Sequence, residues 1–434
     1  TYIIPAGSFQ RYVDETTGKT IVDATSFALS ETSTPVSFLR IPYLIVTSCV
    51  SQGSIIFGII LIAGALEIVL HTGMFQVFCN KLSRICSVGG REKLFIPIMT
   101  FVFVLMGLTQ STDKFIAFAP LGVMLALTMG YDAIVGVAIV LLGVGISYSA
   151  GSFSQVTMIA QQIAELPLYS DFEYRLVITG ILYVVTAAYI SRYAMRIKAD
   201  PTKSYLYDVK GVMTFDVDPD EEVKIKPINY ITLIAFIALM ALLVYGCLRW
   251  NWGMNEASAL FIWMGIICGA LNRISPSEMC RIFIKGAGAA AGASLVVGLG
   301  ATVSAIMTEG GIIDTCVYYI SNMLNYMPDI LKAPVMFVVN VLINLLIPSG
   351  NGQAVVVMPI LTPISDIIGV TRQTTVTAFK LGEGLCNYIL PHASALMGCL
   401  GLTGVPYEKW MKFMWKLFCI WCVLSMIFVG IGNV

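Results

Sequence analysis

Charged side chains are scarce in this sequence. Lysine, arginine, aspartate and glutamate make up 12% of its 434 residues, against roughly 25% in an ordinary soluble domain. Apolar residues make up 57%. A soluble protein of this size covers its surface with charge, and this chain has too little charge to do so. The composition therefore excludes a soluble protein and predicts an all-α polytopic membrane protein in a lipid bilayer.

Several functional signatures are also missing. The formal net charge is zero and no basic cluster is present, which excludes a nucleic-acid partner. The sequence contains no HExxH, GxSxG, Walker or GxGxxG motif. The 11 cysteines are scattered, mostly in apolar runs, so we interpret them as small buried hydrophobic residues. We expect neither an enzyme nor a bound cofactor.

Apolar runs of spanning length divide the chain into two halves, residues 1–195 and 228–434. The polar stretch 196–227 joins them. Basic residues at the start of this stretch (Arg192, Arg196, Lys198) predict a cytoplasmic linker by the positive-inside rule.

Two further segments give local predictions. Thr1–Gly7 resembles the outer end of an apolar segment, so we expect another transmembrane helix upstream. Residues 74–86 alternate apolar and basic positions at helical spacing, which predicts an interfacial amphipathic helix.

The two halves repeat one unit. Comparing residues 120–167 with 359–406 aligns five identical glycine or proline pairs, where composition alone gives about 0.44. The pairs are Pro120/Pro359, Gly130/Gly369, Gly143/Gly382, Gly145/Gly384 and Pro167/Pro406. Such repeats are usually inverted about an axis in the membrane plane, and their interrupted segments mark a transport site. The alternative is an old duplication with packing kinks.

The interrupted apolar segments predict where that site lies. We expect re-entrant hairpins at 110–130 and 349–369, and broken helices at 132–166 and 373–404. A break leaves backbone N–H and C=O groups unpaired, which hydrocarbon tolerates only where they face protein, water or a ligand. Two symmetric breaks therefore predict one shared polar cavity.

Polar and ionisable side chains in these segments are the candidate ligands for a small-molecule substrate. Ionisable groups inside apolar runs are functional candidates, although Lys380 and Glu383 could simply neutralise each other at i,i+3. His392 follows a proline at the break, and it is either a satisfied core histidine or a proton-handling one. The predicted substrate-binding residues are Gln110, Ser111, Thr112, Asp113, Lys114, Ser152, Ser154, Ser349, Gly350, Asn351, Gly352, Gln353, Lys380, Glu383, Asn387 and His392.

Other charged residues are expected to have structural roles. Glu67 and His71 lie one helical turn apart and could pair. Glu309 and Asp314 flank a glycine turn and are expected to be solvated.

The stretch from Pro348 to Trp410 closely resembles the YfcC-like branch of the DcuC/ArcD group. The motifs are IPSGNGQAVVVMPILTPISDIIGVTRQ, FKLGEGLCNYILP and GVPYEKW, together with TYIIPAGSF, GGREKLFIP and GYDAIVGVAIVLLGVGISYSAG upstream. The resemblance covers essentially the whole chain. It implies a multi-pass secondary carrier of the bacterial inner membrane with two inverted repeats, re-entrant hairpins, elevator-type motion and a homodimeric assembly. Family members are described as basic amino acid antiporters or C4-dicarboxylate carriers.

This chain departs from the family pattern at three positions. The first hairpin usually carries two adjacent acids, where this chain has Asp113 and Lys114. An uncharged glutamine is usual at Lys380, and a threonine at His392. These changes add positive or protonatable groups, which favours a substrate bearing a carboxylate.

The sequence thus predicts a secondary transporter or exchanger of a small amino acid or carboxylate metabolite. An arginine/ornithine antiporter is the alternative substrate class. A passive channel and an intramembrane serine hydrolase using Ser349 and His392 are alternatives from other classes. Na⁺, H⁺ or a counter-substrate are all possible sources of coupling.

Overall fold

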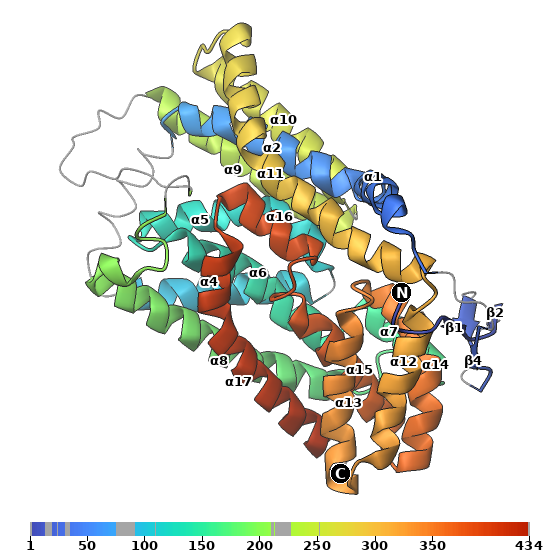
Figure 1. The fold of residues 1–434 in the computed structure, drawn as a ribbon. Helices are drawn as coiled ribbons and strands as arrows, with labels where there is room; N and C mark the ends of the chain where they lie inside the picture. Colours follow the sequence, from blue (N-terminus) through green and yellow to red (C-terminus); the bar gives the residue numbers. More distant parts are fainter. Residues whose placement is uncertain are drawn as a thin grey trace.

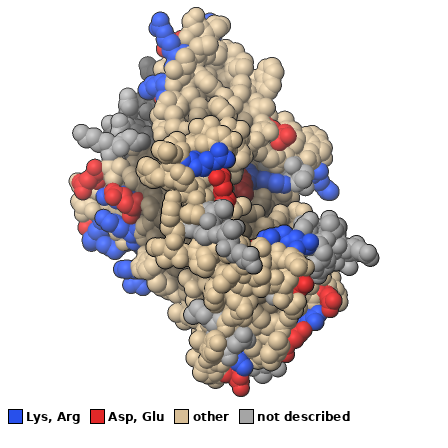
Figure 2. Space-filling view, turned by 45° about the vertical axis from the view of Figure 1, so that its right-hand side comes forward, with Lys and Arg blue, Asp and Glu red and all other residues tan. Residues whose placement is uncertain are grey.

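The computed structural model is predominantly helical, and Figure 1 shows its arrangement. It describes residues 2–13, 20–23, 25–30, 35–74, 92–108, 110–209, 212, 227–250 and 252–432. Among these residues, seven helices are long and apolar enough to cross a membrane. Figure 2 shows broad uncharged areas between separate groups of charged side chains. Both features agree with the membrane class that the composition predicts.

One group of helices lies at the top of Figure 1, and we call it the outer bundle. In it, α2 packs against α10 and α11, α1 packs on α11, and α9 packs on α10. The members are α1 (Ile41–Ser51, preceded by the 3₁₀ turn η1, Phe38–Arg40), α2 (Gly53–His71), α9 (Pro227–Arg249), α10 (Met254–Leu271) and α11 (Pro276–Glu309).

The remaining helices form a second group, the core unit. Its centre is α6, in which every residue is buried. The members are α4 (Glu92–Gly107), η2 (Thr112–Phe118), α5 (Ala119–Thr128), α6 (Ala133–Ala150), α7 (Gln155–Ile163), α8 (Phe172–Ala199), η3 (Pro201–Lys203), α12 (Ile313–Asn322), η4 (Met323–Tyr326), α13 (Asp329–Asn344), α14 (Gly350–Ile368), α15 (Arg372–Cys386), α16 (Ser394–Thr403) and α17 (Tyr407–Ile431).

Both broken helices are present. The first is interrupted between α6 and α7, where Gly151 ends α6 in the left-handed region (φ 69°) that favours glycine. The second is interrupted between α15 and α16, over residues 387–393.

Helix boundaries recur at the 239-residue spacing of the sequence repeat. α7 begins at Gln155 and α16 begins at Ser394. α5 and α14 are each followed by a glycine at positive φ, Gly130 (77°) and Gly369 (78°). The backbone carbonyl just before each glycine accepts a hydrogen bond from a lysine ammonium. Lys198 donates to Met129 at 3.2 Å, and Lys332 donates to Ile368 at 3.4 Å. The two halves therefore share local structure as well as sequence.

The segments predicted as complete hairpins are single arms. Residues 349–369 form one helix, α14, and 110–130 form η2 followed by α5. The helices that precede these segments are α4 and α13, which the sequence predicts as ordinary spans. In the second half the chain turns between α13 and α14, at residues 345–349, one helix earlier than predicted.

Two predicted segments lie partly outside the described residues, and one predicted ion pair has a different partner. Of the predicted interfacial helix 74–86, all but Met74 lies outside the described residues, as does much of the linker 196–227. The first residues of that linker continue α8 as far as Ala199. Glu67 pairs with Lys285 at 2.8 Å rather than with His71.

The N-terminal segment forms two short antiparallel pairs that attach to the core unit. β1 (Gly7–Ser8) pairs with β4 (Ala28–Leu29), with Gly7 opposite Leu29, and β2 (Arg11–Val13) pairs with β3 (Thr20–Val22), with Arg11 opposite Val22. Asp314, at the start of α12, accepts hydrogen bonds from the Arg11 guanidinium at 2.8 Å and the Phe9 backbone N–H at 3.1 Å. Its side chain is 7% exposed, so the expectation of a solvated Asp314 is wrong.

We expect Asp314→Ala to release this N-terminal segment. The substitution leaves the buried Phe9 N–H without an acceptor, at a cost of about 2 kcal/mol, and also removes the ion pair with Arg11. Trypsin cleavage within residues 2–30 of the purified protein, followed by mass spectrometry, should therefore become faster. The matched control is Glu309→Ala, whose ion pair with Arg40 has an acid that is 38% exposed and contributes less than about 1 kcal/mol. Equal cleavage rates in the two variants would show that Asp314 does not hold the segment.

Candidate functional site

The two halves exchange partners at the centre of the core unit. α7, from the first broken helix, packs on α14, the second arm of the second hairpin. α16, from the second broken helix, packs on η2, the start of the first hairpin's second arm. α6 and α15 pack against each other behind both. This crossing brings both helix breaks and both hairpin turns to one place.

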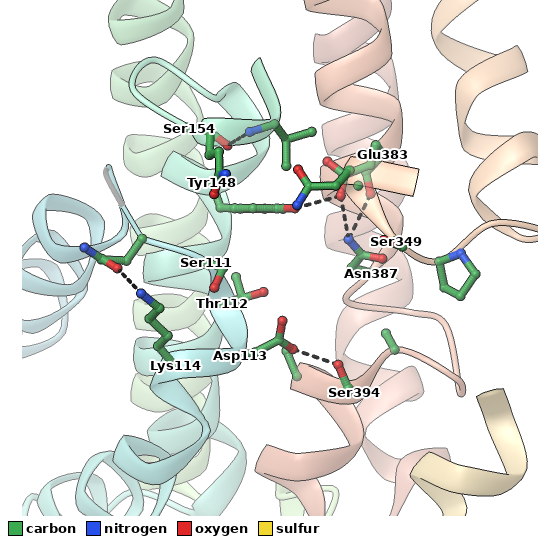
Figure 3. Close-up of a pocket in the computed structure, with 18 of the residues that line it drawn as sticks. Ser111, Thr112, Asp113, Lys114, Tyr148, Ser154, Ser349, Glu383, Asn387 and Ser394 are labelled. Carbon is green, nitrogen blue, oxygen red and sulfur yellow. Dashed lines mark hydrogen bonds between the residues drawn. The ribbon is translucent and has the colours of Figure 1, made fainter. Parts of the chain in front are cut away.

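A cavity of about 590 Å³ lies where these elements meet. Figure 3 shows polar side chains from both halves surrounding it. Its lining residues are Gln52, Ile55, Gln110, Ser111, Thr112, Asp113, Lys114, Tyr148, Ser154, Gln155, Val156, Pro348, Ser349, Gly350, Asn351, Glu383, Asn387, Ala393, Ser394 and Ala395.

Three α-helices begin at this cavity. The first residues of α7, α14 and α16 all line it. Ser154 caps α7 by accepting the Val156 N–H, and Ser349 caps α14 by accepting the Gly352 N–H. Ala393, at the start of α16, has no side chain that can cap. Helix starts present backbone N–H groups and a partial positive charge, which together bind anions.

Among the residues that the structure describes, two acids and one base line the cavity with charged side chains. Asp113 accepts a hydrogen bond from the Ser394 hydroxyl at 2.7 Å, which joins the first hairpin to α16. Lys114 donates to the Gln110 side-chain carbonyl at 2.7 Å. Glu383 enters from α15 on the opposite side (Figure 3). The cavity therefore combines the partial positive charge of backbone N–H groups with the Asp113 carboxylate, which suits a cationic group.

Glu383 is held by a buried cluster. Its Oε2 accepts from Lys380 Nζ at 2.6 Å, and its Oε1 accepts from the Tyr148 hydroxyl at 2.8 Å. The Lys380 and Glu383 side chains are 0% and 1% exposed. Asn387 donates to the Glu383 backbone carbonyl at 3.0 Å. The pairing that the i,i+3 spacing allows is therefore present, and only Glu383 of the pair lines the cavity.

Eleven of the sixteen predicted residues line this cavity and five do not. Gln353 is fully buried and donates to the Asn340 carbonyl at 3.2 Å. His392 lies against Gly300 of α11 instead of facing the cavity. The five residues outside the lining are Ser152, Gly352, Gln353, Lys380 and His392. Their positions do not support direct contact with a solute in this cavity.

Some lining residues were not selected from the sequence. Tyr148 lies beside the break in the first half, and Ser394 follows His392, so both had a signal in the repeat. Gln52 and Ile55 come from the start of α2, far along the chain, where no local pattern marks them.

The structure also bears on two other site hypotheses. Among the described residues, no group of three or more His, Cys, Asp or Glu side chains is placed to hold a metal ion. Ser349 Oγ is occupied as a helix cap, and His392 Nε2 has no hydrogen-bond partner. Ser349 and His392 are therefore not arranged as a nucleophile and its base.

Comparisons with known proteins give the following similarities. The chain is 27% identical over 453 residues to "Putative basic amino acid antiporter YfcC" of Escherichia coli (strain K12), covering 95% of this chain and 88% of that protein. It is 26% identical over 372 residues to an uncharacterized protein of Haemophilus influenzae, covering 84% and 72%. A crystal structure of the YdaH transporter of Alcanivorax borkumensis matches with a TM-score of 0.43 and 17% identity, covering 98% and 94%.

The family comparison spans nearly the whole chain. The model of the DcuC family, described as C4-dicarboxylate anaerobic carrier, matches residues 1–433. The sequence-based family prediction is thereby confirmed, and so is a multi-pass membrane protein that carries out transport. The chain belongs to the DcuC family of membrane carriers.

Proposed function

We propose that this protein is a secondary transporter of the bacterial inner membrane that exchanges a small amino acid. The observation that supports this proposal best is the cavity where three helix starts face the Asp113 carboxylate. Helix starts suit the carboxylate of an amino acid, while the Asp113 carboxylate suits its ammonium group. This arrangement favours a zwitterion over a solute with only negative charge. The name of the E. coli relative supports the same substrate class.

The polar side chains of the cavity supply the remaining contacts in this proposal. Hydroxyl and amide groups that line it can donate to a carboxylate or accept from an ammonium group. They come from both halves and comprise Gln110, Ser111, Thr112, Ser154, Ser349, Asn351 and Asn387.

The proposal includes two inverted repeats and an elevator-type movement of the core unit past the outer bundle. A second cavity of about 290 Å³ supports this movement. It is lined by Glu67 and Leu70 of α2 and by residues 401–404 at the end of α16, whereas the first cavity meets the opposite ends of both helices. Along α2, from Ile55 to Leu70, the separation is about 22 Å. Sliding α16 along α2 and α11 would carry the site from one cavity toward the other. Assembly as a homodimer belongs to the same proposal.

Counterflow in proteoliposomes tests the function. Vesicles loaded with unlabelled L-arginine, L-ornithine, L-aspartate, succinate or fumarate would be given the labelled compound outside. We expect saturable, trans-stimulated exchange of an amino acid. Exchange of succinate or fumarate without any amino acid would replace this proposal with a C4-dicarboxylate carrier, which the family description favours. Uptake that does not saturate would indicate a channel.

Asp113→Asn should weaken exchange of the amino acid selectively. A charge-assisted hydrogen bond is worth about 1.5–3 kcal/mol, so we expect KM to rise by about tenfold or more. Asp329→Asn is the control, because Asp329 is 93% exposed and paired only at the surface. An unchanged KM in Asp113→Asn would remove this carboxylate from the proposed ammonium site.

A further inference from the structure

The Lys380–Glu383 pair is sealed behind the cavity. Nζ of Lys380 lies 2.6 Å from Glu383 Oε2, and the lysine side chain is 0% exposed. The same ammonium lies 3.4 Å from the centroid of the Tyr148 ring, a position suited to cation–π attraction. Lys380 thus has two fixed partners and does not line the cavity.

The protein is shaped to keep Lys380 in this position. A Cβ added at Gly151 would lie 2.5 Å from Lys380 Cγ and 3.0 Å from its Cε. The lysine stem therefore passes through space that only a glycine leaves open. Because the stem is enclosed on this side and the ammonium is paired, Lys380 is a permanent part of the site rather than a group that a substrate displaces.

The pair sets the charge around Glu383. Oε2 is taken by Lys380, and Oε1 accepts from Tyr148 at 2.8 Å. A metal cation at this carboxylate would lie beside the lysine ammonium and be repelled by it. Without Lys380, a carboxylate that is 1% exposed would need another cation, because an unpaired buried charge is strongly unfavourable.

We propose that the Lys380 ammonium is a tethered cation that takes the place of a dissociable coupling cation at the Glu383 carboxylate. This inference rests on the proposed function, because it assigns how the transport site is kept neutral. The lysine moves with the site, so the carrier needs no Na⁺ at Glu383 to complete its cycle. Coupling then comes from the exchanged solute and not from a sodium gradient acting at this carboxylate.

The thermal stability of the purified protein tests this inference, and the test does not require the substrate to be identified. The probe is Na⁺, added as sodium chloride against choline chloride at equal ionic strength. We expect no Na⁺-specific change in the wild-type Tm. Lys380→Gln should gain a saturable Na⁺-specific increase of about 2 °C or more. Lys380→Gln combined with Glu383→Gln should lose that increase, because the carboxylate is gone.

A matched lysine gives the control. Lys332 pairs with Asp329 at the same i,i+3 spacing and the same 2.6 Å distance, but that acid is 93% exposed. Lys332→Gln should therefore produce no Na⁺-specific stabilisation. Lys380→Arg retains a cation and should also show none.

Two results would overturn the inference. The first is a Na⁺-specific stabilisation of wild type that Glu383→Gln removes, which would place a metal ion at the carboxylate despite Lys380. The second is the absence of a Na⁺ effect in folded Lys380→Gln. If Lys380→Gln does not fold, the double variant decides: recovery of folding supports charge replacement, and failure of both variants contradicts it. Counterflow tests the proposed function separately. If the wild-type protein shows no exchange but the Tm results are as expected, the proposed function fails and the assignment of Lys380 as a tethered cation is retained.

Discussion

Joining residues 300 and 392 by a disulfide should stop exchange and leave binding intact. Gly300 belongs to α11 of the outer bundle, and His392 lies in the break before α16 of the core unit. A Cβ at Gly300 would lie 2.7 Å from the His392 Cβ. Bridged cysteines need about 3.5–4.5 Å between Cβ atoms. The added Cβ also lies 2.7 Å from the His392 Cα, so the two backbone segments must separate by about 1 Å to form the bond in Gly300→Cys/His392→Cys.

The expected loss follows from the proposed movement. If α16 must slide along α11, a covalent link holds the carrier in the state shown in Figure 1. Under oxidising conditions, counterflow should fall below about one tenth of the wild-type rate, and it should recover on reduction. A substrate should still raise the Tm of the oxidised protein, because the cavity in this state is unchanged. Full exchange by the cross-linked protein would contradict movement between these two helices.

A second disulfide provides a matched control inside the outer bundle. A Cβ at Gly298 would lie 3.2 Å from the Cβ of the native Cys49 on α1. Gly298→Cys can therefore form a bridge between α1 and α11, two helices of the same bundle. Oxidation of this variant should leave exchange within about twofold of wild type. The single variants Gly300→Cys and His392→Cys control for pairing with other native cysteines.

The sequence predicts those parts of the fold that depend on local composition. The scarcity of charge predicts the membrane class. The paired glycines 143/382 and 145/384 lie inside α6 and α15, which are interrupted several residues later, at Gly151 and at residues 387–393. Polar runs such as Ser111–Asp113 and Ser349–Asn351 predict segments that line the cavity, because such groups are costly in hydrocarbon unless they face a polar space.

Features that depend on long-range packing were not predictable from local pattern. The sequence predicts ordinary spans where α4 and α13 lie, and their local pattern does not indicate that each leads directly into a segment that lines the cavity. The spacing of Lys380 and Glu383 predicts a pair but not which member faces the cavity, because that depends on how α15 is rotated against α6. Asp314 is paired with Arg11, about 300 positions earlier in the chain. Nothing near Asp314 in the sequence indicates this contact.

Gly350→Ala should disable the transport site although it adds a single methyl group. A Cβ at Gly350 would lie 2.6 Å from Glu383 Oε1 and 2.9 Å from the Tyr148 hydroxyl oxygen. These two atoms are hydrogen-bonded to each other at 2.8 Å and are buried. Relieving the contact therefore either breaks the bond between them or moves both side chains, and with them the carboxylate that lines the cavity. Loss of a buried hydrogen bond costs about 1–3 kcal/mol, so we expect kcat/KM for counterflow to fall by about tenfold or more.

Gly352→Ala separates this effect from a general change in α14. Gly352 lies in the same helical turn, and its added Cβ would meet Ser349 side-chain atoms at 3.3 Å and no cavity carboxylate. Replacing glycine by alanine in a helix favours folding by about 0.8–1.0 kcal/mol, so this variant should keep its Tm and exchange at close to the wild-type rate. Wild-type exchange by Gly350→Ala would mean that the position of Glu383 is not critical for the substrate. Equal losses in both variants would instead assign the effect to the start of α14. Loss confined to Gly350→Ala would identify the Tyr148–Glu383 contact as the part of the site that the substrate requires.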